Sequence, residues 1–319
     1  MSSKAGSLLP ASTCRKPLPE VLGPDLCVGA RQLAMLTELI RDTYVLFDKV
    51  ISVHPVMLGS QWKRHVVAVT HYGRLYGLKL RNNERLASTE ETASRLAVLL
   101  SAPNAYQTFR VRLPDTLHVP GAGLLFARDE RVNLTEWPAG EKHLSRLFPE
   151  ELAELRRPGN VESFLGQMGE WMGFAEIFGQ EDTDMAGSWI IVPGGWRLQL
   201  TTAATAFTRP PSWGCAFRWH LPWEEIAALD VTHPTFTHLA AGMAQMIDKY
   251  RERESEVRQI LAESETGRGW EPHVPEPTPE WIFGKLQDCL AGRNNQMIAR
   301  PLIPLPSERG VAWSWRDPS

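Results

Sequence analysis

A chain of 319 residues, with 43% apolar and 22% charged residues, has an ordinary globular composition and can form one large domain or two smaller ones. The formal net charge of −3 argues against bulk binding to nucleic acid or to an anionic membrane. The first 157 residues carry 21 Lys and Arg against 16 Asp and Glu, a net of +5, and the rest carry 13 against 21, a net of −8. This asymmetry is compatible with self-association or with a surface for partners that carries both positive and negative charge, although unequal charge between the halves of a sequence is common.

The four cysteines, Cys14, Cys27, Cys215 and Cys289, are far apart and include no C-x-x-C pair. This spacing excludes the usual zinc-ribbon pattern and a dense disulfide framework. We find neither a signal peptide nor an uncharged apolar segment of about 18 residues. We therefore expect a cytoplasmic protein with reduced thiols and no contact with a membrane.

In the first half of the chain, we expect residues 1–26 to form an extended arm, because they are rich in Ser and Pro. Apolar residues spaced three to four apart predict an amphipathic helix over about 28–53. A hairpin with strands 66–70 and 75–80 should follow. Ser88 and Glu91 match a capping box and predict a helix from there to about residue 101. Short strands are expected at 109–113 and 123–126.

The second half begins with a predicted helix after Pro158. We expect Gly166, Gly169 and Gly173 in this helix to allow a neighbouring element to pack closely, and we favour this over contact with a ligand. Two further helices are predicted, and their ranges are 235–264 and about 280–292, with a Pro-rich spacer between them at 267–279.

Five of the twelve tryptophans lie between residues 186 and 223, around a predicted hairpin with strands 188–192 and 196–200. A third apolar strand is expected at 215–221. Alternation along these strands places Trp196, Phe217 and Trp219 on one face, which we interpret as core.

The ends of this ribbon are the candidate binding surface. Prolines flank them, and aromatic and basic side chains there could stack on a base, a sugar or an aromatic residue of a partner. The predicted binding residues are Arg209, Trp213, Arg218 and Trp223, with Trp313 and Trp315 of the Pro-rich tail.

These elements together predict an α+β fold, with antiparallel hairpin-based sheets packed against amphipathic helices. The clearest domain boundary is near Pro158-Gly159. We predict an arm over 1–26, an α+β domain over 27–158, a second α+β domain with the tryptophan-rich sheet over 159–265, and a Pro-rich tail over 266–319.

Local catalytic motifs are absent from the sequence: it has no G-x-S-x-G elbow, no P-loop and no H-E-x-x-H. Asp182 and Asp184 could hold a divalent metal beside a diphosphate, but acidic residues in a polar loop are usually only solvated. Asp230, His233 and His238 are the closest approach to a transition-metal cluster, and helix capping explains them better. We therefore assign no catalytic residue, no metal site and no cofactor.

These observations favour a non-catalytic interaction or assembly protein, with a protein partner or self-association. The first alternative is a nucleic-acid-associated protein that uses the basic N-terminal half and the Arg/Trp rim. The second alternative is an enzyme whose site is dispersed along the chain and is assisted by a metal at the Asp230, His233 and His238 group.

Overall fold

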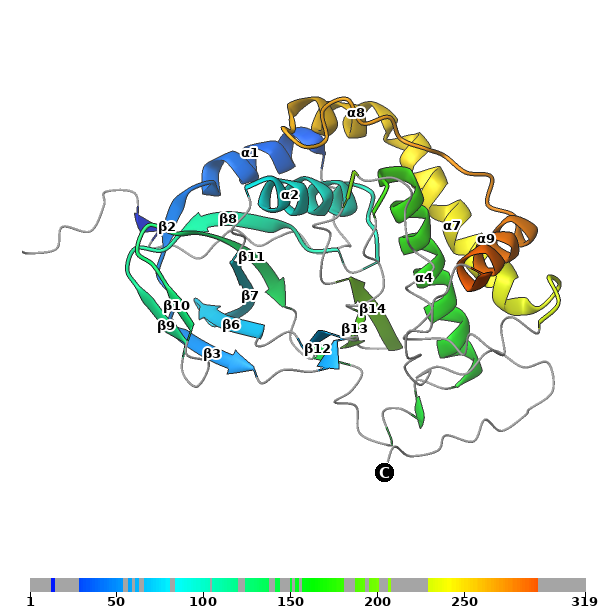
Figure 1. The fold of residues 1–319 in the computed structure, drawn as a ribbon, viewed down its shortest axis with the longest axis horizontal. Helices are drawn as coiled ribbons and strands as arrows, with labels where there is room; N and C mark the ends of the chain where they lie inside the picture. Colours follow the sequence, from blue (N-terminus) through cyan, green and yellow to red (C-terminus); the bar gives the residue numbers. More distant parts are fainter. Residues whose placement is uncertain are drawn as a thin grey trace, which may run out of the picture.

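The protein is known from a computed structural model, and the structural statements below concern the following residues, which it describes: 13–14, 29–53, 57–58, 61–62, 66–80, 84–103, 105–119, 124–137, 141–143, 150, 153–154, 157–180, 187–192, 195–200, 206–207 and 229–291. Within these ranges a curled sheet lies beside a group of helices (Figure 1). The predicted α+β fold class is confirmed.

Seven strands form the main sheet in the order β1-β2-β8-β11-β7-β6-β3. The bounds are β1 Thr13–Cys14, β2 Thr43–Val45, β3 Lys49–Val53, β6 Val66–His71, β7 Arg74–Leu80, β8 Thr108–Arg112 and β11 Arg131–Trp137. The strands from β8 to β3 in this order are antiparallel, and β6–β7 is the predicted first hairpin. The sheet is nevertheless mixed, because β2 pairs in parallel with both β1 and β8.

Three smaller sheets complete the β structure of the described residues. Their strands are β4 Met57–Leu58 with β5 Gln61–Trp62, β9 Leu117–Val119 with β10 Leu124–Phe126, and β12 Glu141–His143 with β13 Gly187–Val192 and β14 Gly195–Leu200. The β13–β14 pair confirms the predicted tryptophan-containing hairpin, since Val192 pairs with Gly195. The predicted third strand, 215–221, lies outside the described residues.

The main helices are α1 Ala30–Ile40, α2 Glu84–Leu99, α4 Pro158–Phe178, α7 Pro234–Glu252, α8 Glu254–Glu263 and α9 Pro279–Ala291. Helices α1 and α2 lie over the sheet, whereas α4, α7 and α9 pack beside it, and α8 runs back toward α1 (Figure 1). In the part of the chain that the structure describes, no helix combines the length and the apolar character that crossing a membrane requires.

Two helix predictions are wrong at their ends. The helix expected over 28–53 stops at Ile40, because Asp42 takes a left-handed conformation (φ 58°) and the β-branched and aromatic residues after it form β2. Helix α2 begins at Glu84 and not at the capping box, so Ser88 lies inside it. The Glu91 carboxylate accepts a hydrogen bond from Arg41, the C-cap of α1, instead of turning back to cap the helix.

Glycines allow α4 and α7 to approach each other backbone to backbone. A Cβ on Gly169 would lie 2.2 Å from the carbonyl oxygen of Leu239, and a Cβ on Gly242 would lie 2.0 Å from that of Gly166. Real Cβ contacts do not come this close, so each position requires a glycine. The close-packing prediction for the α4 glycines is thereby confirmed at Gly169 and at Gly173, whose Cβ would lie 3.0 Å from that of Met246.

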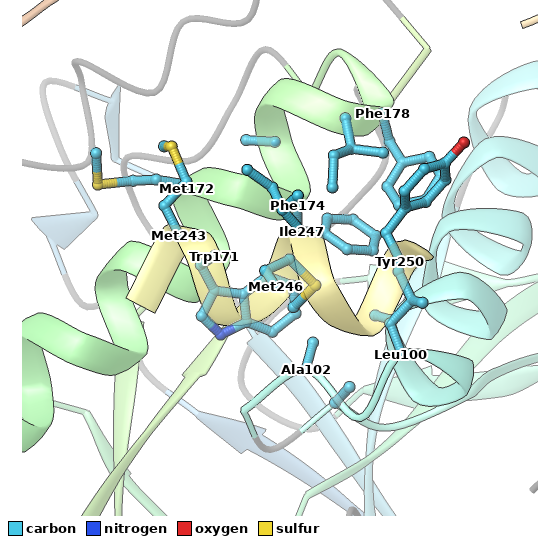
Figure 2. Packing of buried hydrophobic residues seen from close by; sticks show 14 of the residues in the cluster. Leu100, Ala102, Trp171, Met172, Phe174, Phe178, Met243, Met246, Ile247 and Tyr250 are labelled. Atoms are coloured by element: carbon cyan, nitrogen blue, oxygen red, sulfur yellow. The ribbon is translucent and has the colours of Figure 1, made fainter. Parts of the chain in front are cut away.

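One large apolar cluster fills the space between these two helices. Figure 2 shows the aromatic side chains of α4 against the apolar side chains of α7, with residues of the segment after α2 joining them: Trp171, Phe174, Phe178, Met243, Met246, Ile247, Tyr250, Leu100 and Ala102. This cluster includes residues from both sides of the predicted boundary at 158–159. The end of α2 is therefore packed into the helical part of the molecule.

Candidate functional site

The two faces of the main sheet differ in chemistry. Cross-strand register places Leu78 beside Leu134, and Leu134 beside Phe109, on a face that belongs to a second buried apolar cluster. One residue further along each strand, the opposite face carries polar rows. The first row is Lys79, Asn133 and Arg110, and the second is Gly77, Thr135 and Thr108.

Helix α2 covers this polar face and is itself polar where it is buried. All its residues from Ala87 to Leu99 are buried, and they include Ser88, Thr89, Glu90, Glu91, Thr92, Ser94 and Arg95. A buried polar group costs on the order of 1–3 kcal/mol unless it forms a hydrogen bond. A layer of this kind must therefore be held by specific partners.

Glu90 has partners on both carboxylate oxygens. Lys79 Nζ lies 2.5 Å from Oε1, and Asn133 Nδ2 donates to Oε2 at 2.9 Å. Asn133 also donates to the carbonyl oxygen of Ala87, one turn earlier in α2. The Glu90 side chain is only 2% exposed, whereas that of Lys79 is 25% exposed. The result is a fixed, buried carboxylate paired with the ammonium group of a lysine whose side chain is partly exposed.

A second buried carboxylate lies next to the first along α2. Glu91 Oε2 is 3.2 Å from a guanidinium nitrogen of Arg41, at the C-terminal end of α1. Burial raises the pKa of Glu91, and the nearby Arg41, Arg110 and Arg95 offset only part of that shift. Two adjacent acidic residues in the helix thus face two different elements, with Glu90 toward the sheet and Glu91 toward α1.

The predicted binding residues Arg209, Trp213, Arg218, Trp223, Trp313 and Trp315 lie outside the described residues. The side chains of Trp196 and Trp219, which we predicted to be core, also lie outside them. The role of Arg209 and the other predicted binding residues stays a prediction.

Two members of the predicted alternative metal cluster, Asp230 and His233, instead form local hydrogen bonds just before and at the start of α7. Asp230 Oδ1 accepts a hydrogen bond from the backbone of Thr232 at 2.8 Å, and this bond lowers the pKa of Asp230. His233 is the N-cap of α7, where its Nδ1 accepts from the backbone N–H of Thr235. Over the ranges that can be described, no three His, Cys, Asp or Glu residues converge on a metal position.

No family model and no curated protein matches the chain. Among solved structures, the chain is similar to WaaP in complex with acyl carrier protein, with a TM-score of 0.36, 12% identity, and coverage of 73% of this chain and 92% of that one. It is also similar to the Helicobacter pylori proinflammatory kinase CtkA, with a TM-score of 0.36, 8% identity, and coverage of 71% and 87%.

The interpretation as a non-catalytic interaction or assembly protein is corrected here. One of these two structures is named as a kinase, and that interpretation is not retained. Similarity at this level supports no particular activity, so any activity must follow from the residues of the chain itself. The nucleic-acid alternative depended on the Arg/Trp rim and is not retained.

Sequence reasoning missed Lys79, Glu90 and Asn133. Asn133 is on β11, a strand that was not predicted at all, and Glu90 was assigned to the predicted capping box. One signal was available in the printed sequence. Lys79 interrupts an otherwise apolar strand, on the face opposite Leu78. If a helix covers that face, the lysine is partly buried and needs an acidic partner on the helix.

Proposed function

We propose that the protein binds the phosphate groups of a nucleoside triphosphate at Lys79 and transfers a phosphoryl group from it. The observation that supports this is the Lys79–Glu90 pair at 2.5 Å. In protein kinases, a lysine on the third strand of the sheet contacts the phosphates and pairs with a glutamate on the helix that follows.

The positions of the two residues in the topology agree with that arrangement. Lys79 is on the third strand of the β3-β6-β7 meander, and Glu90 is on α2, which follows it. The next two long strands are β8 and β11, and β11 inserts between β8 and β7.

The local chemistry also suits phosphate binding. An anion could approach the partly exposed side chain of Lys79, while Glu90, held by Asn133, keeps the lysine extended along the polar face. Donors fixed in advance stabilise developing negative charge without reorganising during reaction. The pair would thus orient the phosphates and stabilise the negative charge on them.

A divalent cation commonly accompanies nucleotide phosphates. Within the described ranges no three His, Cys, Asp or Glu residues come together, although one or two carboxylates can suffice for a magnesium ion that also binds phosphates. Asp182 and Asp184 lie outside those ranges, and no step of the proposed function is assigned to a metal ion.

Replacing Lys79 with methionine should weaken ATP binding about 10- to 100-fold, because it removes a charge-assisted contact worth about 1.5–3 kcal/mol. Isothermal titration of wild type and variant with ATP, with and without magnesium, measures the change. The same samples should transfer phosphate from γ-labelled ATP to themselves or to a generic acceptor more slowly in the variant.

The matched control is Lys49→Met, an exposed lysine of β3 in the same sheet. It should bind ATP like the wild type. Wild-type protein that shows no saturable ATP binding at millimolar concentration would contradict the proposal, and so would a Lys79→Met variant that binds ATP as tightly as Lys49→Met does.

Two further predictions stay proposals. A cytoplasmic location rests on the spacing of the four cysteines. Contact with a protein partner, or self-association, rests on the opposite net charges of the two halves of the sequence.

A further inference from the structure

Helix α2 is held from the side that faces away from the sheet. At about 100° per residue, Thr92 lies about 200° and Arg95 about 140° around the helix from Glu90. The Thr92 hydroxyl is 2.8 Å from the Ser264 hydroxyl, and Arg95 Nη2 is 3.4 Å from Glu263 Oε2. Both partners are at the C-terminal end of α8, so α8 contacts α2 on the side opposite Glu90.

Ser264 is a fixed partner in this contact. It is the C-cap of α8, it is 6% exposed, and its hydroxyl oxygen accepts hydrogen bonds from the backbone of Thr266 and Gly267 at 3.2 and 3.0 Å. Its hydroxyl also lies 3.3 Å from the Thr266 hydroxyl, and in the shorter pair with Thr92 either hydroxyl can be the donor. Because the turn after α8 orients Ser264, the contact specifies where α2 lies.

The C-terminal end of α2 is held by cations from the other part of the chain. The last turn of α2 has no basic residue of its own. Arg253, between α7 and α8, donates to the carbonyl oxygen of Leu99 at 2.6 Å, and Lys249 of α7 donates to that of Ser101 at 2.9 Å. Cations at a helix C-terminus stabilise its unpaired carbonyl groups.

The α7–α8 junction also connects to α1, which flanks α2 on another side. Arg253 is paired with Glu256 at 3.0 Å, and Glu256 accepts a hydrogen bond from the backbone of Ala30 at 2.7 Å, at the start of α1. Figure 1 shows α1, α2 and α8 close together above the sheet. Helix α2 is therefore enclosed by the sheet, by α1 and by α8.

We infer that α8 is a positioning element for the Lys79–Glu90 pair: Arg253, Glu263 and Ser264 hold α2 where Glu90 reaches Lys79. These are positioning residues, since none of them contacts either member of the pair in the contacts described above. Their effect on nucleotide affinity rests on the proposed function, whereas their effect on the pair does not.

The test uses the full-length double variant Arg253→Gln/Ser264→Ala, with Arg258→Gln as its control. Arg258 is also on α8, but it is 53% exposed and pairs with Glu254 of the same helix. The readout is the rate at which a trace acylating reagent modifies Lys79, measured by peptide mass spectrometry across pH 7–10, with Lys49 as internal reference. Lys79 should react about fivefold or more faster in the double variant, because its ammonium loses the carboxylate that holds and shields it.

Affinity for ATP should fall by a similar factor in the double variant and stay unchanged in Arg258→Gln. Equal Lys79 labelling in the folded double variant, the control and the wild type would overturn the inference. If the double variant does not fold, Thr92→Val, which keeps the shape of the side chain and replaces its hydroxyl with a methyl group, is judged by the same two criteria. Faster labelling in a protein whose wild type does not bind ATP would support the inference while contradicting the proposed function.

Discussion

Replacing Lys249 with methionine is expected to lower the free energy of unfolding by about 3–5 kcal/mol at pH 8. Lys249 Nζ lies 2.5 Å from Glu170 Oε2, and the two side chains are 24% and 10% exposed. Burial raises the pKa of Glu170 even with Lys249 in place to oppose it. Without the lysine, a charged carboxylate would remain between α4 and α7 with its ammonium partner removed.

This loss of stability should depend on pH in a definite direction. Burial favours the protonated form of Glu170, so over the pH range between its unfolded and folded pKa values the folded variant binds more protons than the unfolded chain. The free energy of unfolding of Lys249→Met should therefore rise as the pH falls from 8 toward 5. Urea unfolding at both pH values measures it.

Two controls make the result specific. Glu170→Gln/Lys249→Met should lose this part of the pH dependence, because no titrating group is left in the pair. Arg251→Met, at an exposed ion pair of the same helix, should change stability by no more than about 0.5 kcal/mol. A Lys249→Met variant that loses less than about 1 kcal/mol, or that loses more at pH 5 than at pH 8, would refute this account of the pair.

Replacing Gly242 with alanine should lower the free energy of unfolding by about 3 kcal/mol, which is the upper end of the usual range for an overpacked core. Its Cβ would lie 2.0 Å from the carbonyl oxygen of Gly166 and 3.1 Å from the backbone nitrogen of Glu170. Both contacts are to backbone, so no flexible side chain can move aside. The helices would have to separate, and the apolar cluster between them would lose contacts.

The matched control is Gly166→Ala on the facing helix. Among the described residues a Cβ there meets nothing within 4 Å, so the substitution should stabilise the protein by about 0.5–1 kcal/mol through helix propensity. Thermal or urea unfolding of both variants should show a lower free energy of unfolding for Gly242→Ala and a higher one for Gly166→Ala. Equal effects of the two substitutions would show that α4 and α7 do not pack as closely as described.

Local patterns predicted much of the fold. Two hairpins, the helix after Pro158 and the close-packed glycines follow from period-2 and period-3.6 spacing and from turn residues. The errors arose where a single backbone conformation decides the structure. The left-handed Asp42 ends α1, and nothing in the apolar spacing over 28–53 reveals it. Strand β11, at the centre of the sheet, was missed although its apolar Val132 and Leu134 alternate with Asn133 and Thr135, the spacing expected of a strand with one buried face.

The candidate site was not predicted, because its geometry depends on register between strands far apart in sequence. Lys79 and Asn133 become neighbours only when β11 pairs with β7. Glu90 meets them only when α2 covers that face and not the apolar one. The aromatic rim was predicted from composition over a segment whose residues lie outside the described ranges, and that prediction is untested.

The most direct test of the Lys79 site is affinity labelling with an ATP derivative whose terminal phosphate carries a reactive acyl group. Such a reagent acylates a lysine that lies against bound phosphates, and peptide mass spectrometry identifies the residue. The account predicts that Lys79 is modified, that excess ATP suppresses the modification, and that Lys49 is unaffected. A reagent that modifies other lysines and leaves Lys79 intact, or labelling of Lys79 that excess ATP does not reduce, would contradict it.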